Sequence, residues 1–165
     1  MRQSGKNYKR IVVKVGSSLF YRGKDLDILN LFDVISSISG LIKLQAKEVI
    51  IVSSGAIALG MELMKLKFRP KEVSILQAAA AIGQNVLMDS YSKYFKKYGM
   101  ICSQILLTWD DFDNRQRYLN AKNTLLTLLK LGVVPIINEN DTISTEEIKF
   151  GDNDRLSALV ATLIN

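Results

Sequence analysis

The chain has 165 residues, of which 22 are Lys or Arg, 16 are Asp or Glu and none is His, so its formal net charge is +6. This length is typical of one domain, which would bury roughly 70% of the surface that its unfolded chain exposes. The absence of His excludes a Ser-His-Asp triad and most zinc sites, and the single cysteine, Cys102, excludes an internal disulfide framework.

The first nine residues form a basic tail, in which Arg2, Lys6 and Lys9 have no acidic neighbour. The apolar run that follows is interrupted by Lys14 too early for a signal peptide. No apolar stretch approaches the roughly 18 residues that a membrane span requires. We therefore expect a globular protein of the cytoplasm.

Short β-branched runs alternate along the chain with longer helical patterns. The runs predict strands over 11–15, 49–52, 100–107 and 133–137. Apolar residues recurring on one helix face predict helices over 28–45, 57–67, 73–98, 115–131 and 154–164. Residues 142–150 are predicted to form a small hairpin or a loop. Strands that are apolar on both faces and separated by helices indicate an α/β fold, with a parallel sheet covered by helices.

Each predicted strand ends in small or polar residues. Ligands of open parallel sheets bind beyond the carboxyl ends of the strands. We therefore expect the four strand ends to converge on one site at one edge of the sheet. They are Gly16-Ser17-Ser18, Ser53-Ser54-Gly55-Ala56, Thr108-Trp109-Asp110-Asp111 and Asn138-Glu139-Asn140-Asp141.

Lys14 lies inside the first apolar run, which we expect to be a central strand. A buried ammonium without a partner is costly, so Lys14 should meet an anion or a carboxylate. The backbone N–H groups of the following Gly16-Ser17-Ser18 turn can cradle phosphate oxygens. The alternative is an edge-strand lysine that reaches solvent, with Gly16 as an ordinary turn residue.

Two further segments carry polar groups that suit a charged ligand. Ser54 and Gly55 precede a helix whose N-terminus favours a carboxylate or a phosphate, although a capped helix start explains them equally well. Seven Asn, Asp and Glu residues could bind a substrate ammonium, orient a lysine or lie near Mg²⁺ carried by a nucleotide, with turn and cap chemistry as the alternative. They are Asn138, Glu139, Asn140, Asp141, Asp152, Asn153 and Asp154.

Two nucleotide-binding fingerprints, G-x-G-x-x-G and the Walker loop, are absent from the sequence. Lysines and arginines gather in the basic tail and at 65–71 and 93–97, where they could attract nucleic acid. Solvated helix faces are the simpler interpretation, because no zinc-finger spacing or RNA-stacking motif accompanies them. We expect a small anionic substrate rather than nucleic acid, and no metal site built by the protein alone.

Seven segments of the chain are VVKVGSS, IVSSGAIALG, QAAAAIGQ, QILLT, RQRYLNAKNTL, PIINENDTIS and FGDNDRLSALVA. Together they resemble the glutamate 5-kinase branch of the amino-acid kinase family, from about Arg10 to Asn165. NEND followed by GDND is specific to this branch, whereas KVGSS alone would indicate only the family. Ser17 and Ser53 stand where relatives often carry Thr, and they keep the hydroxyl.

The resemblance implies a three-layer α/β/α fold with a mainly parallel sheet. It also implies ATP-dependent phosphorylation of the γ-carboxylate of L-glutamate, with Mg²⁺, as the first step of proline synthesis. Such a carboxylate is already ionised at neutral pH, so the reaction needs no general base. At matching positions, Ser54, Asp141 and Asn153 would bind glutamate, Asp154 would organise the catalytic lysines, and the ATP phosphates would meet Lys14, Gly16 and Ser17.

The kinase domain of that family continues past the position of Asn165, through a strand with an adenine-binding loop and a second catalytic lysine. Residues 10–165 are therefore expected to be the glutamate-binding N-terminal part of such a domain, truncated at its C-terminus and inactive alone. The last predicted strand would leave an unpaired apolar edge. Such an edge promotes association between chains, and we expect a homo-oligomer. The alternatives are a remnant that binds glutamate or a partner without phosphoryl transfer, a sister kinase for aspartate, acetylglutamate or a nucleotide, and a nucleic-acid-binding module.

Overall fold

The computed structural model of the chain describes residues 8–22, 25–26, 29–143 and 153–165. Its main sheet has four parallel strands in the order β1-β4-β6-β5. The four predicted strands are all present, with ends that differ from the prediction by at most two residues. They are β1 (Arg10–Val15), β4 (Glu48–Ser53), β5 (Ile101–Leu107) and β6 (Val133–Glu139).

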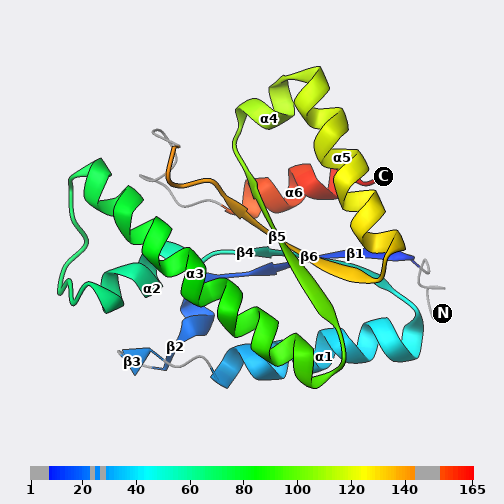
Figure 1. The fold of residues 1–165 in the computed structure, drawn as a ribbon, viewed down its shortest axis with the longest axis horizontal. Helices are drawn as coiled ribbons and strands as arrows, with labels where there is room; N and C mark the ends of the chain where they lie inside the picture. The colour runs from blue at the N-terminus through cyan, green and yellow to red at the C-terminus, as the bar shows by residue number, and fades with distance from the viewer. Residues whose placement is uncertain (1–7, 23–24, 27–28, 144–152) are drawn as a thin grey trace, which may run out of the picture.

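Helices cover both faces of this sheet, which makes the three-layer α/β/α fold (Figure 1). One face carries α1 (Leu29–Gln45), α2 (Ala56–Leu63) and α3 (Val73–Lys97). The other face carries α5 (Arg115–Lys130) and α6 (Asn153–Leu163), and the single turn α4 (Asp110–Asp113) leads into α5. The sequence did not predict the 3₁₀ turn η1 (Ser17–Phe20) or the small antiparallel pair of β2 (Tyr21–Arg22) and β3 (Asp25–Leu26).

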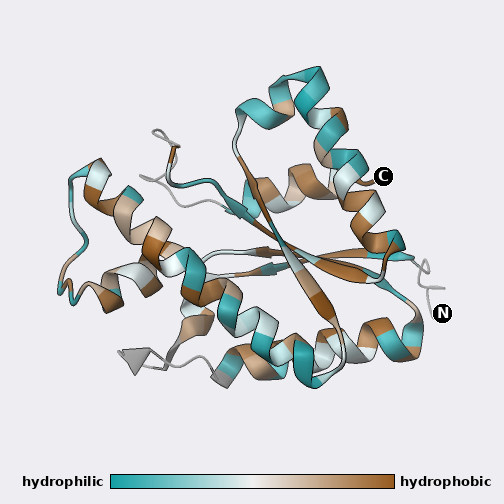
Figure 2. Cartoon of the chain, viewed as in Figure 1, coloured by the Kyte–Doolittle hydropathy of each residue, from teal (hydrophilic) through white to brown (hydrophobic). Residues whose placement is uncertain are grey.

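An apolar core lies on each side of the sheet. Successive side chains of a strand point to opposite faces, and β4 supplies both cores in this way. Val49 and Ile51 face α1 and α3, whereas Ile50 and Val52 face α5 and α6. Figure 2 shows the apolar strands between helices whose outer faces are polar.

The strand order corrects two expectations. The strand β6 was expected to leave an open edge, but it lies between β4 and β5 and pairs with both. The strand β1 was expected in the centre, but it lies at one edge of the described sheet, and the Lys14 side chain is 37% exposed. Both predictions were wrong because burial can be seen in a local pattern, whereas the choice of neighbouring strand depends on contacts far apart in sequence.

Two glycines allow α2 and α3 to approach each other closely. A Cβ on Gly60 would lie 1.8 Å from the carbonyl oxygen of Ala79, and a Cβ on Gly83 would lie 1.8 Å from that of Ala56. No side chain fits in either place. Gly83 therefore holds α3 against the first turn of α2, at the edge of the sheet where the strands end.

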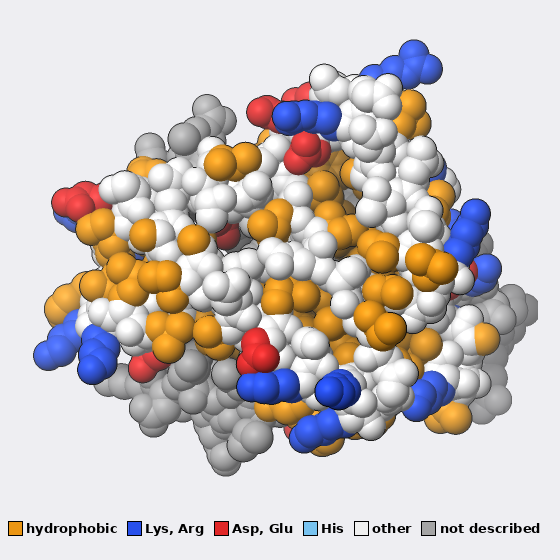
Figure 3. Space-filling model, viewed as in Figure 1, with side chains coloured by type: hydrophobic (Ala, Val, Ile, Leu, Met, Phe, Trp, Pro, Cys, Tyr) orange, Lys and Arg blue, Asp and Glu red, His pale blue; other side chains and the backbone are white. Residues whose placement is uncertain are grey.

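Basic side chains lie around the rim of the face in Figure 3, with acidic side chains among them. In the group at 93–97, Lys93 pairs with Asp89 at 2.6 Å, and Lys97 Nζ lies 5.0 Å from the centre of the Phe32 ring. Both ammonium groups thus interact with neighbouring side chains of this protein. For this group the structure favours the interpretation as a solvated helix face.

Three further expectations concern the ends and loops of the chain. Part of what was expected lies outside the described residues, namely residues 1–7 of the basic tail, most of the loop at 142–150, and Asp152. Lys9, at the end of the predicted tail, pairs with Glu48 at 2.8 Å. No helix in the described part of the chain is long and apolar enough to cross a membrane.

Candidate active site

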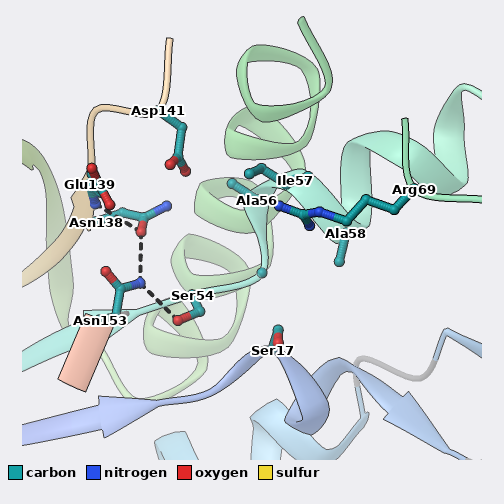
Figure 4. Close-up of a pocket in the computed structure, with 11 residues that line it drawn as sticks. Ser17, Ser54, Ala56, Ile57, Ala58, Arg69, Asn138, Glu139, Asp141 and Asn153 are labelled. Atoms are coloured by element: carbon teal, nitrogen blue, oxygen red, sulfur yellow. Dashed lines mark hydrogen bonds between the residues drawn. The ribbon is translucent and has the colours of Figure 1, made fainter. Parts of the chain in front are cut away.

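A cavity of about 120 Å³ opens at the edge of the sheet where β4 and β6 end. This is far more than one water molecule needs, so the cavity can take a small organic molecule. Three of the four predicted strand ends contribute to it. Its lining residues are Ser17, Ser54, Gly55, Ala56, Ile57, Ala58, Arg69, Asn138, Glu139, Asp141 and Asn153 (Figure 4).

The first turn of α2 forms one wall of this cavity. The Ser54 N–H donates to the Val15 carbonyl at 2.8 Å, which ties the end of β4 to the end of β1. Gly55 has φ +110°, and a Cβ there would lie 2.6 Å from the Phe20 ring, so this position requires glycine. The helix then begins at Ala56 with no side-chain cap, which leaves N–H groups of its first turn available to a ligand. Such a wall suits a carboxylate.

Asn153, the first residue of α6, joins this wall to the end of β6. Its side-chain nitrogen lies 2.7 Å from Ser54 Oγ, 3.2 Å from the Ser53 carbonyl and 3.1 Å from Asn138 Oδ1. Figure 4 shows the bonds to Ser54 and Asn138 crossing the floor of the cavity. The two amide hydrogens are shared among three oxygens. Asn153 therefore holds the ends of β4 and β6 and the start of α6 together.

Charged side chains occupy the remaining walls. Asp141 lies just beyond the end of β6, and Arg69 enters from the loop between α2 and α3, its side chain running along the first turn of α2 in Figure 4. Burial, together with the nearby Glu139 carboxylate, raises the pKa of Asp141 to about 7, and Arg69 acts in the opposite direction. A carboxyl group of this kind ionises readily when a cation arrives, because the cation favours its charged form. This part of the cavity therefore suits an ammonium group.

Lys14 and Asp154 form an ion pair beside the cavity, with Nζ 2.7 Å from Oδ1. Lys14 thus meets a carboxylate, as the sequence predicted. A Cβ on Gly16 would lie 3.6 Å from Lys14 Nζ, so the ammonium lies next to the Gly16 backbone. Because η1 begins at Ser17, N–H groups of its first turn are available in the same region. A lysine beside the first N–H groups of a 3₁₀ turn suits phosphate oxygens.

The expected convergence of four strand ends is wrong for Thr108-Trp109-Asp110-Asp111, which does not line the cavity. The Asp111 carboxylate accepts hydrogen bonds from the Thr108 N–H at 2.7 Å and its hydroxyl at 3.0 Å. The Arg155 guanidinium lies 4.1 Å from the centre of the Trp109 ring. This segment follows β5, which is two strands away from β4, so its polar groups serve local structure instead.

Two residues near the site were missed by sequence reasoning. Arg69 was grouped with the solvated basic residues at 65–71, and no local pattern separates it from them. Gln84 on α3 accepts a hydrogen bond from Asn138 Nδ2 at 3.0 Å. The sequence contained an indication of this position, because Gln84 lies at helical spacing on the apolar face of α3. The same face carries Leu76, Ala80 and Leu87, which are all buried.

Among the residues that the structure describes, no group of three His, Cys, Asp or Glu side chains is placed to hold a metal ion. Lys14 Nζ, beside the Gly16 backbone and the start of η1, is placed to meet phosphate oxygens.

Known proteins resemble the chain over nearly its whole length. Residues 9–165 match the amino acid kinase family. The chain belongs to this family. It is 53% identical over 165 residues to a protein of Azoarcus sp. (strain BH72) named glutamate 5-kinase, covering 99% of this chain and 44% of that relative. A glutamate 5-kinase of Burkholderia cenocepacia (strain HI2424) is 57% identical over 157 residues, which are 94% of this chain and 42% of the relative.

A third relative is matched over a similar share of its length. The glutamate 5-kinase of Marinomonas sp. (strain MWYL1) is 52% identical over 165 residues. The chain again spans 44% of that relative's length. The chain thus covers less than half of these curated relatives.

Proposed function

We propose that the protein carrying this chain is a glutamate 5-kinase, which transfers the γ-phosphoryl group of ATP to the γ-carboxylate of L-glutamate for proline synthesis. The proposal rests on one observation. One cavity is lined both by the Glu139 and Asp141 carboxylates and by the N-terminus of α2, and the Lys14–Asp154 pair lies beside it. The names of the relatives support the same substrate.

The cavity offers a complementary group to each charged end of L-glutamate. The Asp141 carboxylate would pair with the substrate ammonium. The Ser54 hydroxyl and the first N–H groups of α2 would receive the α-carboxylate. Asn153 would hold Ser54 in place for that contact, since its amide lies 2.7 Å from the Ser54 hydroxyl. Bound in this way, the substrate would extend its γ-carboxylate toward Lys14.

The transfer itself requires charge neutralisation rather than proton transfer. An oxygen of the γ-carboxylate attacks the γ-phosphorus of ATP, the bond from that phosphorus to the bridging oxygen breaks, and ADP leaves with the electron pair. Lys14 would neutralise charge on the transferring phosphoryl group, next to Gly16 and Ser17. Asp154 would orient the Lys14 ammonium, and Mg²⁺ bound to the nucleotide would offset the remaining phosphate charge.

The proposal is tested by a coupled assay that follows ADP release by the protein with L-glutamate, L-aspartate or N-acetyl-L-glutamate as acceptor. ADP release that depends on L-glutamate, and is weak with the other two, is expected. Preference for another acceptor would indicate a sister kinase instead. Binding of L-glutamate in calorimetry without any ADP release would indicate the alternative of a chain that binds glutamate but does not transfer phosphate.

A further inference from the structure

A chain of buried amides runs from α3 to the floor of the cavity. The Asn138 Nδ2 group donates to Gln84 Oε1 at 3.0 Å, and Asn138 Oδ1 accepts from Asn153 Nδ2 at 3.1 Å. The same Asn153 nitrogen donates to Ser54 Oγ at 2.7 Å. Gln84, Asn138 and Asn153 are 9%, 2% and 6% exposed, so water cannot easily replace these bonds.

The orientation of the Asn138 amide is set from two sides, by the acceptor that Gln84 supplies and by the donors around Asn138 Oδ1. Asn138 Oδ1 accepts from two donors, Asn153 Nδ2 and the Glu139 N–H, the latter at 2.9 Å. A rotation of the Asn138 amide by half a turn would bring its own donor against both of them. With Gln84 Oε1 on the opposite side, only one orientation of Asn138 satisfies all its partners.

Gln84 does not behave as an ordinary packing residue. Its Nε2 is buried and has no hydrogen-bond partner among the described residues. A buried donor without a partner is destabilising, and an apolar side chain of the same length would avoid that cost. Gln84 also lines a small hollow of about 10 Å³, shared with Glu139 and Asp141, which is room for about one water molecule.

We propose that Gln84 is a positioning residue of the amino-acid site, which fixes the Asn138 amide and, through it, Asn153 and the Ser54 hydroxyl. The identity of the ligand as L-glutamate rests on the proposed function, but the positioning of the side chains does not. Gln84 acts through its acceptor oxygen, and its volume alone is not sufficient.

The first experiment measures the positioning without any ligand. Gln84→Met keeps the length of the side chain and removes the acceptor, so the Asn138 amide is left with an unpaired buried donor and is held less firmly. The hydrogen-exchange protection of the Asn153 side-chain amide, followed by NMR, is expected to fall at least about tenfold. Gln84→Glu retains an acceptor oxygen and should keep most of that protection. Unchanged Asn153 protection in Gln84→Met would overturn the inference.

A control on the same helix separates positioning from general loss of stability. Ser90→Ala removes another buried polar group of α3, whose hydroxyl donates to the Val86 carbonyl at 2.8 Å outside the amide chain. It should leave the Asn153 amide signals unchanged. If Gln84→Met does not fold, Gln84→Leu removes the same acceptor oxygen with another apolar side chain, and it should release the Asn153 amide in the same way.

The second experiment measures the consequence for the ligand by calorimetric titration with L-glutamate. Gln84→Met is expected to raise the Kd about tenfold, while Ser90→Ala stays close to the parent chain. An unchanged Kd despite loss of Asn153 protection would overturn the role of Gln84 in the site. If the parent chain does not bind L-glutamate, the proposed function fails, and the exchange measurement still decides the positioning.

Discussion

Lys14 and Asp154 form a close pair that remains accessible to solvent. Their side chains are 37% and 73% exposed, so water screens their attraction. Exposed pairs of this kind contribute at most about 1 kcal/mol to stability. An incoming phosphate can therefore compete for the Lys14 ammonium at little cost to the fold, which is the behaviour expected of a residue held ready for transfer.

Removing the Lys14 ammonium should affect turnover rather than folding. In the active protein, Lys14→Ala is expected to lower kcat by about 10²–10³, with little change in the KM for glutamate, because the charge it meets develops during transfer. Lys93→Ala is a matched control, since Lys93 also forms an exposed pair, with Asp89 at 2.6 Å. Steady-state kinetics measure both variants, and an unchanged kcat in Lys14→Ala would remove this residue from the mechanism.

Asp141 illustrates how a binding group can reduce the stability of the free protein. Its pKa is raised to about 7 in the folded chain, against about 4 in an unfolded one. Between these values the folded state binds more protons than the unfolded state, so stability falls as the pH rises from about 4 to about 7. Above pH 7 the ionised carboxylate remains desolvated until a cation pairs with it.

Asp141→Asn should remove this pH dependence. The variant is expected to be more stable than the parent chain at pH 8, by about 1–2 kcal/mol after allowing for partial exposure, and to differ little from it at pH 4. Urea unfolding at the two pH values measures the effect. Asp113→Asn, at an exposed carboxylate on α4, is the control and should show no such gain. Equal behaviour of the two variants would show that Asp141 titrates normally.

At the scale of elements, the contact between α2 and α3 determines where the anion-binding wall lies. The first turn of α2 can line the cavity because Gly83 admits the Ala56 carbonyl into direct contact with α3. At the next residue of α3, the Gln84 side chain reaches Asn138 at the end of β6. The helix α3 therefore positions two walls of the cavity at once, through a close backbone contact and through a side chain.

Gly83→Ala should disrupt this contact. A Cβ 1.8 Å from the Ala56 carbonyl oxygen forces the two helices apart, so we expect a loss of about 3 kcal/mol in the free energy of unfolding. Gly40→Ala is the control, because nothing lies within 4 Å of the added Cβ on α1. That change should stabilise the chain by about 0.5–1 kcal/mol through helix propensity. Chemical denaturation compares them, and similar values for both would contradict the close contact.

At the scale of the molecule, the described sheet has two edges, β1 and β5, rather than the open edge expected at β6. The β5 edge carries Ile101, which is 69% exposed, whereas the β1 edge carries the Lys14 charge. Charged side chains on edge strands oppose pairing between chains, and apolar ones favour it. Self-association of the chain, which stays a prediction, should therefore proceed through β5.

Ile101→Lys should reduce that self-association. The added charge lies on the edge strand, where it opposes pairing with a second copy. Leu131→Lys is the matched control, because Leu131 is similarly exposed, at 71%, but lies in the turn between α5 and β6. Sedimentation velocity over a range of concentrations should show a smaller associated fraction for Ile101→Lys only. An equal decrease in both variants would assign the effect to net charge.

The sequence by itself determined the four strands of the main sheet, the long helices and most of the polar residues of the cavity. The strands around Val13, Ile51 and Ile136 follow from runs of four to eight residues, and the helices follow from periods of 3.6, so both are encoded locally. The placement of Ser54 and Asp141 beside one cavity followed from their positions after parallel strands, whose carboxyl ends lie at one edge of a sheet.

Tertiary structure alone decided the strand order and the partners within the site. The insertion of β6 between β4 and β5 left Trp109 outside the cavity lining and brought Asn138 against Gln84, residues 54 positions apart. Arg69 lines the cavity from the loop between α2 and α3, and Lys14 is accessible because β1 lies at an edge. Each of these outcomes depends on packing between segments distant in sequence, and a local pattern contains no information about such contacts.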